Sequence, residues 1–178
     1  MWKITALVFF LLVLVVPCLA QAPAHWDWRE QGAVTPVKNQ GACGSPWAFG
    51  PVAAVESKLL ILQNLTMDLS EQELVSCTAK MLGKTGFDSC NGGYDTDALD
   101  YIRLYGIASE SSFPYQATDL ACPANLPQSV AQIDGYYYVA VDSNLTVTMQ
   151  NIKQAIYHDG PVVADANNEG ITAAARRA

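Results

Sequence analysis

Histidine and positive charge are both scarce in this chain. Its 178 residues include two histidines, and ten lysines and arginines stand against seventeen aspartates and glutamates, which gives a formal net charge of −7. The basic residues form no patch. Because nucleic-acid binding depends on clustered positive charge, we expect no nucleic-acid partner. The scarcity of histidine leaves only His25 and His158 as candidates for an imidazole base.

The chain also lacks a hydrophobic run long enough to cross a membrane comfortably. One mainly apolar stretch, residues 4–16, follows Lys3, and small residues then occupy the third and first positions before a cut after Ala20. This layout predicts a secretory signal peptide over residues 1–20, with a signal anchor as the alternative, and a mature chain from Gln21. We expect no stable membrane anchor and a secretory destination, either extracellular or a lysosome or vacuole. The acidic composition does not choose between these destinations.

Spacing typical of a metal site is absent as well. Of five cysteines, Cys18 falls in the predicted signal peptide, and Cys43, Cys77, Cys90 and Cys122 remain. They include no C-x-x-C pair and no neighbouring histidine, so we expect no zinc site and no cofactor. An even number of cysteines in an oxidising compartment predicts two disulfides, and three pairings are open.

The sequence offers two candidate sites for attached sugar. N-L-T triplets occur at residues 64–66 and 144–146. This is the acceptor pattern for N-linked glycans, which makes Asn64 and Asn144 candidate glycosylation sites in a secreted chain. Such triplets also arise by chance.

Local patterns in the first half of the chain predict mostly helices. Glycine and proline punctuate residues 27–45, which we expect to be loop and extended chain, and a helix is expected to start near Pro46. Residues 52–63 are apolar on most sides, which predicts a buried helix. Ser70 and Glu73 predict a capping box, in which each side chain would bond to the backbone N–H of the other residue.

The second half combines helices with strand signals. Residues 95–106 predict a helix capped by Asp95 or Thr96 and ended by Gly106, and residues 145–160 predict another helix. Residues 133–141 and 161–166 read as strands, whereas the Ala-rich tail carries no strand pattern.

Several stretches together resemble the papain-like cysteine peptidases, near the cathepsin L type. They are "WDWREQGAVTPVKNQGACGSPWAFG", "LSEQELVSC", "CNGGY", "YGI", "FPY" and "GPVV", in the family's order and spacing over about residues 25–166. The resemblance implies an α+β papain-like fold of two lobes. We expect residues 21–134 to form an essentially complete helical lobe with an N-terminal extended segment. Residues 135–178 are expected to form a truncated β-barrel-like lobe and a tail that does not match.

The resemblance also implies a disulfide pairing and a catalytic layout. Cys43 would pair with Cys90 and Cys77 with Cys122. Gln40 matches the family's oxyanion-hole glutamine, whereas Pro46 occupies the position of the nucleophilic cysteine. Proline offers neither an attacking atom nor the N–H that serves as the second oxyanion donor in the family. The segments that carry the family's catalytic His and Asn are not found before Ala178.

No neighbouring residue is expected to replace the nucleophile. Ser45 lacks a positioned base, and Cys43 is better explained as a disulfide partner. His25 lies before the motif and His158 before a predicted strand, so both are expected to be ordinary surface residues.

Proline is compatible with the start of a helix at residue 46, because the first helical N–H has no helical partner. Ser45 is expected to be extended, as a residue before proline and an N-cap. Pro51 lies further inside, so we predict either a kink at residues 50–51 or a late helix start there.

Four residues match the family's substrate cleft. Gly92 and Gly93 match the segment whose backbone pairs with an extended peptide, Tyr94 matches a wall of the main specificity pocket, and Trp47 matches a cleft-floor aromatic. Turn glycines and core aromatics are the alternative interpretation.

Three functional hypotheses follow. The main hypothesis is a papain-family homologue that is catalytically inactive as written, either a degenerate product or a truncated one. The second is a pseudo-peptidase that binds peptides or cystatin-like inhibitors. The third is an active cysteine peptidase whose sequence is erroneous at residue 46 or partial.

Overall fold

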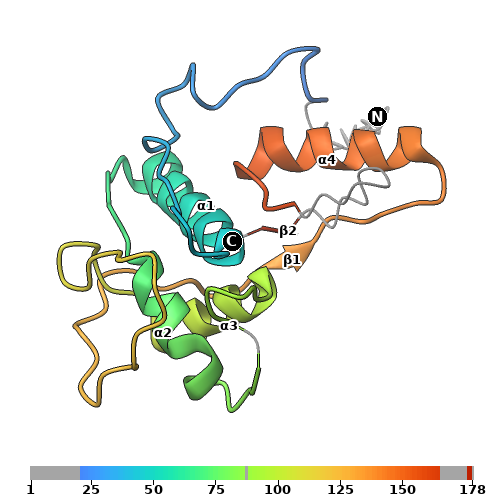
Figure 1. Ribbon diagram of the computed structural model, residues 1–178. Helices are drawn as coiled ribbons and strands as arrows, with labels where there is room; N and C mark the ends of the chain where they lie inside the picture. The colour runs from blue at the N-terminus through green and yellow to red at the C-terminus, as the bar shows by residue number, and fades with distance from the viewer. Residues whose placement is uncertain (1–20, 87, 165–175, 178) are drawn as a thin grey trace, which may run out of the picture.

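The computed structural model describes residues 21–86, 88–164, 176 and 177, so the predicted signal peptide lies outside it. Three helices pack together: α1 (Pro46–Gln63), α2 (Glu71–Met81) and α3 (Asp95–Tyr105). The helix α4 (Leu145–Asp159) lies apart from them, beside a two-stranded antiparallel ribbon of β1 (Tyr137–Tyr138) and β2 (Arg176–Arg177) (Figure 1). The molecule therefore has a three-helix part and a thinner part that follows it in the chain.

Helix α1 begins at Pro46 as expected, but it continues through Pro51, so the late start at residues 50–51 is wrong. A reason is Gly50. The clash of a proline ring with the preceding residue involves that residue's Cβ, which glycine lacks. The N–H groups of Ala48 and Phe49 both donate to the Ser45 carbonyl oxygen, which closes the first turn ahead of the proline. A kink at this point stays a prediction.

Ser45 differs from the expected extended N-cap. Its φ of −115° and ψ of 30° are not extended, and its side chain caps no helical N–H. The hydroxyl instead lies 2.7 Å from the hydroxyl of Tyr115. A long-range partner thus replaces the local cap.

Helix α2 confirms half of the capping box. The Ser70 hydroxyl accepts a hydrogen bond from the Glu73 N–H at 3.0 Å. The prediction that the Glu73 side chain bonds to the Ser70 N–H is wrong. The Glu73 carboxylate instead accepts from the Tyr101 hydroxyl and from the Ala108 N–H, both at 2.8 Å. Both partners are distant in sequence, so Glu73 joins α2 to α3 and to the chain that follows α3.

Helix α3 starts one residue earlier than the predicted caps. Its N-cap is Tyr94, and Asp95 and Thr96 already belong to the helix. The Asp95 carboxylate accepts from the Thr96 N–H at 3.0 Å. Gly106 ends the helix as expected, with a φ of 74° that favours glycine.

The strand predictions are only partly confirmed, whereas α4 agrees closely. Residues 133–141 form a strand only at Tyr137 and Tyr138. Of the predicted strand 161–166, residues 161–164 contain no strand, and residues 165 and 166 lie outside the described residues. A strand is present at Arg176 and Arg177, where the tail carried no strand pattern. Helix α4 is capped by Asn144, whose side chain accepts from the Thr146 N–H, and Gly160 follows its end.

The main core lies between α1, α2 and α3. The predicted burial of residues 52–63 holds from Val52 to Ser57 except at Ala53, which is exposed, and Leu62 is 66% exposed. A second, small cluster joins Val139 and Ala155 to Ile152 and Val162. The main core is formed by Cys43, Trp47, Ala48, Val52, Val55, Leu69, Leu74, Val75, Cys77, Ala98, Tyr101, Ile102, Ile107 and Ala131.

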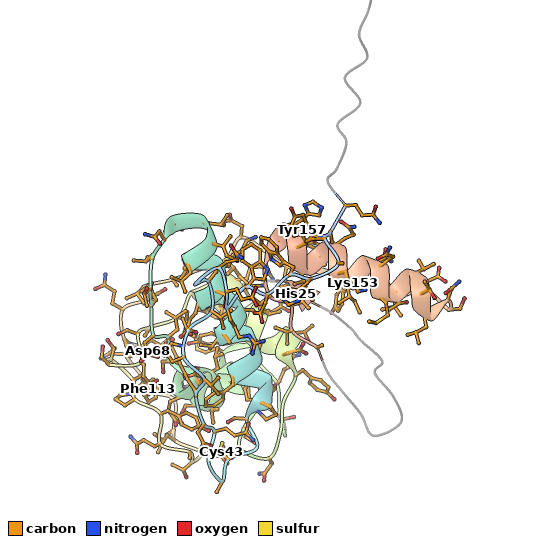
Figure 2. All side chains as sticks on the ribbon, turned by 90° about the horizontal axis from the view of Figure 1, so that it is seen from above. His25, Cys43, Asp68, Phe113, Lys153 and Tyr157 are labelled. Carbon is orange, nitrogen blue, oxygen red and sulfur yellow. A yellow bond between two sulfur atoms is a disulfide. The ribbon has the colours of Figure 1, made fainter. Side chains whose placement is uncertain are left out.

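Two disulfide bonds cross-link the three-helix part. They join Cys43 to Cys90 and Cys77 to Cys122, which is the pairing that the resemblance implied. Side chains fill the space around α1, α2 and α3, whereas α4 projects from this body (Figure 2). Cys43 lies at an outer edge of the body, and His25 lies near Lys153 of α4. The first bond ties the start of α1 to the segment before α3, which positions the candidate site.

Candidate functional site

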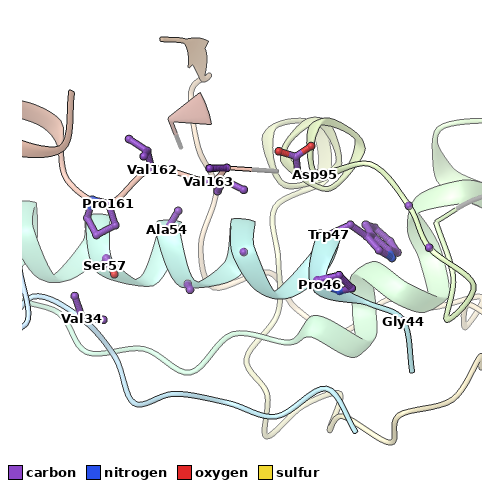
Figure 3. Close-up of a pocket in the computed structure, with 15 residues that line it drawn as sticks. Val34, Gly44, Pro46, Trp47, Ala54, Ser57, Asp95, Pro161, Val162 and Val163 are labelled. Atoms are coloured by element: carbon purple, nitrogen blue, oxygen red, sulfur yellow. The ribbon is translucent and has the colours of Figure 1, made fainter. Parts of the chain in front are cut away.

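A groove of about 490 Å³ runs along α1 from Pro46 to Ser57. Residues 161–164, Gly92, Gly93 and Asp95 also line it. Figure 3 shows Pro161, Val162 and Val163 on the side facing α1, and Asp95 on the same side near Trp47. Apart from Ser57, Asp95 and the indole N–H of Trp47, the lining consists of glycine and apolar residues. The remaining lining residues are Val34, Gly44, Gly50, Ala53, Ala54, Pro161, Val162, Val163 and Ala164.

Pro46 lies exposed at the head of this groove, as the first residue of α1. Its neighbours offer no substitute nucleophile. The Cys43 sulfur is bonded to Cys90, and the Ser45 hydroxyl is buried against the Tyr115 hydroxyl. The groove therefore presents a saturated ring at its head, with no reactive oxygen or sulfur at residues 43–46.

Gln40 is held close to the start of α1, but it does not line the groove. Its carbonyl oxygen accepts from the Cys43 N–H at 3.4 Å and from the Tyr115 hydroxyl at 2.9 Å. The same hydroxyl contacts Ser45, so Tyr115 joins Gln40 to the residue before Pro46. Burial raises the pKa of Tyr115, which keeps this hydroxyl protonated and able to donate.

The role of Tyr115 was not found by sequence reasoning. The stretch "FPY" contributed to the resemblance without a function for its tyrosine. Its two contacts, with Gln40 and Ser45, are separated from it by 75 and 70 residues, so no local pattern signals them.

Trp47 and Gly93 come together as a tightly packed pair. The Trp47 side chain is 5% exposed, and its indole N–H donates to the Ser89 carbonyl oxygen at 3.0 Å. A Cβ atom on Gly93 would overlap the indole ring. Gly44 makes a similar close approach, since its N–H donates to the Cys90 carbonyl oxygen at 2.8 Å and its own Cβ would lie 2.7 Å from that oxygen.

The two adjacent glycines differ in what their backbones offer. Gly92 and Ser89 exchange backbone hydrogen bonds of 3.2 and 3.0 Å, so the N–H and carbonyl of Gly92 are used within a tight turn. For Gly93, no bond from either backbone group to another described residue is found. Only one of the two glycines can therefore present both groups to an extended chain.

Tyr94 lies beside this groove and does not line it. Its side chain is 54% exposed, and its N–H donates to the Asp88 carboxylate at 3.1 Å. Burial raises the pKa of the Asp88 carboxyl.

Neither histidine is placed to act as a base at residue 46. The His25 ring bonds to the Glu30 carboxylate at 3.3 Å, and the His158 ring bonds to the Gln154 side chain at 3.1 Å. Neither histidine lines the groove. The described residues thus bring no imidazole to its head.

A partly buried charge cluster anchors the loop that carries Gln40. The Lys38 ammonium donates to Glu56 at 2.8 Å, to Glu71 at 2.9 Å and to Asp68 at 2.7 Å. Burial raises the pKa of Glu71 to about 7. Burial alone would lower the pKa of Lys38, but the hydrogen bonds that its ammonium donates to Asp68, Glu56 and Glu71 raise it. The cluster ties the loop to α1 and to α2.

In the sequence, Glu56 is the residue that could have indicated this charge cluster. It is the main interruption of an otherwise apolar helix, and a charge buried in such a helix requires a partner. The sequence does not say that the partner is Lys38, which lies 18 residues away in a loop.

Metal and membrane sites are absent from the part of the chain that the structure describes. Within it, no three His, Cys, Asp or Glu side chains form a group suited to a metal ion. The described helices are also too short or too polar to cross a membrane.

Comparison with known proteins identifies the family. The family model described as papain family cysteine protease matches residues 22–173. Cathepsin S of Bos taurus is 40% identical over 141 residues, which cover 79% of this chain and 40% of that protein. The chain thus spans about two fifths of the length of that relative.

Solved structures agree with this match. A structure reported in work on the mite allergens Blo t 1 and Der p 1 has a TM-score of 0.70 and 29% identity, over 83% of this chain and 47% of that one. The Carica candamarcensis cysteine protease in complex with E-64 has a TM-score of 0.56 and 39% identity, over 65% of this chain and 52% of that one. With its four described helices and short ribbon, the chain has the α+β papain-like fold and belongs to the papain family of cysteine proteases.

Proposed function

We propose that this papain-family chain does not hydrolyse peptide bonds. The observation that carries the proposal is Pro46, exposed at the head of the groove on the first turn of α1. Hydrolysis by this family needs a thiolate at that position and the N–H of the same residue as an oxyanion donor. Proline removes both groups. Loss of a single oxyanion donor costs about 10²- to 10³-fold in rate, and loss of the attacking atom removes the covalent route.

The surroundings of Pro46 support the same conclusion. A replacement nucleophile needs a base within hydrogen-bonding reach. The Ser45 hydroxyl bonds to Tyr115, and the two histidines bond to Glu30 and Gln154.

Peptide turnover and thiol labelling test this proposal. The purified chain is expected to give no turnover of fluorogenic peptides above background and no adduct with a thiol-reactive epoxide. The matched control is Pro46→Cys, which places a thiol at the helix N-terminus and is expected to form the adduct. Turnover by the unsubstituted chain would contradict the proposal. Resequencing codon 46 separates a true proline from an error in the sequence.

A second candidate function is the binding of an extended peptide or a cystatin-like inhibitor in the groove. The observation that favours it is the Gly93 backbone, whose two polar groups have no described partner beside an apolar groove. An extended chain can pair with such groups as an added strand. In a related plant protease, E-64 is bound.

Calorimetry with an extended peptide or a cystatin tests this binding. We expect Gly93→Ala to abolish it, because the added Cβ overlaps Trp47 and displaces the backbone. Gly135→Ala is the control, since a Cβ there meets no atom within 4 Å. A folded Gly93→Ala protein, judged by circular dichroism, that binds as well as the control would count against the groove as the site.

The secretory destination and the domain boundary are part of the same proposal. A leader pattern over residues 1–20 supports entry into the secretory pathway, with the extracellular space or a lysosome or vacuole as destination. N-terminal sequencing of a product expressed in eukaryotic cells is expected to start at Gln21. Two separate hydrophobic clusters support a helical lobe over residues 21–134 and a second unit over 135–178.

A further inference from the structure

Three of the most exposed large apolar side chains lie close in sequence to two asparagines. Among the large apolar residues that the structure describes, four are more than 60% exposed: Val37 at 100%, Leu145 at 68%, Leu62 at 66% and Val141 at 62%. All except Val37 lie within three residues of Asn64 or Asn144 in the sequence. Single exposed leucines are common, but such a concentration beside two N-L-T triplets is not explained by core packing.

The first triplet lies at the end of α1, where its asparagine is accessible. Asn64 is exposed and terminates the helix in the left-handed conformation, with φ of 51° and ψ of 37°. Its N–H donates to the Leu60 carbonyl oxygen at 3.0 Å, and no bond from its side chain to another described residue is found. Leu65, 43% exposed, follows it directly. The amide nitrogen of Asn64 is thus open to solvent beside apolar surface.

The second triplet lies at the start of α4, where the asparagine side chain is already oriented. The Asn144 Oδ1 atom accepts from the Thr146 N–H at 2.9 Å. This cap uses the amide oxygen and leaves the amide nitrogen, Nδ2, outside the contact. Leu145 follows directly, and Val147 and Met149 are 41% and 43% exposed. A substituent on Nδ2 is therefore compatible with the helix cap.

We propose that Asn64 and Asn144 both carry N-linked glycans and that these glycans cover the apolar side chains beside them. The transfer uses a lipid-linked oligosaccharide pyrophosphate as co-reactant. The bond between the first sugar carbon and the pyrophosphate oxygen breaks, a bond from that carbon to Nδ2 forms, Nδ2 loses one proton, and the lipid pyrophosphate leaves. The inference rests on the proposed secretory destination.

Site occupancy is tested in the full chain secreted from eukaryotic cells behind a heterologous leader. This leader makes failure of the chain's own leader distinguishable from failure of glycosylation. Enzymatic removal of glycans in water enriched with heavy oxygen is expected to leave a labelled aspartate at 64 and at 144. Asn64→Gln and Thr146→Ala are each expected to lose one glycan, the latter with the Asn144 cap intact. Asn91→Gln, outside any triplet, is the control that loses none. An unlabelled asparagine at either position overturns the proposal for that position.

The covering role has its own measurement. Binding of a hydrophobic dye to the native protein is expected to rise when the glycans are removed without denaturant. Leu62→Ser and Leu145→Ser are expected to reduce that rise while changing little in the glycosylated protein. Equal dye binding before and after removal of the glycans would overturn the covering role.

Discussion

The three-helix part and the part after residue 134 are stabilised very differently. Helices α1, α2 and α3 share a continuous core, and two disulfides cross-link this part of the molecule. The Lys38 charge cluster further ties its loop to α1 and α2. In α4, by contrast, only Thr148 and Ala155 are buried. This helix is held by single contacts, among them the Trp28 indole on the Ile156 carbonyl oxygen at 2.6 Å and the Lys58 ammonium on the Asp159 carbonyl oxygen at 2.7 Å. The difference indicates that the three-helix part contributes most of the free energy of folding.

The largest expected effect comes from removing a cross-link in the three-helix part. Replacing Cys77 and Cys122 by serine opens a loop with a sequence separation of 45 residues. In the chain-entropy model this lowers the free energy of unfolding by about 4 kcal/mol. Urea unfolding followed by circular dichroism measures it. A loss below about 1 kcal/mol would contradict the assignment of stability to this part.

A matched pair of leucines sharpens the comparison. Leu74 in α2 is fully buried, whereas Leu145 in α4 is 68% exposed. We expect Leu74→Ala to cost about 3 kcal/mol through lost burial and a cavity, and Leu145→Ala to cost less than about 0.5 kcal/mol. Thermal unfolding of the two variants provides the measurement, and similar losses for both would remove the distinction between the parts.

Acidification is expected to strengthen the three-helix part. Burial raises the pKa of Glu71 to about 7 from a model-compound value of 4.5, so the folded state binds this proton more readily than the unfolded state. The contribution to stability is therefore fully present below about pH 4.5 and is lost as the pH rises through about 7. Burial raises the pKa of Glu73 and Glu110 as well, in the same direction.

The expected gain in the free energy of unfolding from pH 7 to pH 5 is about 1–2 kcal/mol. Unfolding curves across this pH range test it. Glu71→Gln is the control, because it keeps a hydrogen-bonding oxygen near Lys38 and removes the titration. An unchanged pH profile in that variant would assign the effect to other groups.

The smallest expected effect concerns the attachment of α4. Trp28→Phe removes the indole N–H that bonds to Ile156 and keeps an aromatic ring. One hydrogen bond contributes about 1 kcal/mol. Amide hydrogen exchange is expected to accelerate in α4 and to stay unchanged in α2. Acceleration in both helices would mean that the two parts unfold together.

Local chemistry was predicted better than long-range contact. The start of α1 at Pro46, the Ser70 cap and the end of α3 at Gly106 each depend on residues within a few positions, and all three were predicted. The partners of Glu73 and Ser45 lie far along the chain, so the return bond of the capping box and the extended Ser45 were both wrong.

The strand predictions were only partly correct, for a related reason. A strand forms only with a partner, and among the described residues the stretch 133–141 pairs only with Arg176 and Arg177. For the candidate site, the resemblance supplied the positions, but it did not reveal that Gly92 and Ser89 pair with each other. Nor did it reveal that Tyr115 joins Gln40 to Ser45.

The tryptophans lie in two different places, so tryptophan fluorescence can report on the main core and on α4 separately. Trp47 lies in the main core with its indole against Gly93 and bonded to Ser89. Trp26 packs edge-on against Tyr157 of α4 at 4.8 Å, and Trp28 bonds to the same helix. The fourth tryptophan, Trp2, falls in the predicted signal peptide. Intrinsic fluorescence of the mature chain therefore combines a signal from the core with a signal from the docking of α4, and replacing Trp47 by phenylalanine isolates the second without any added label.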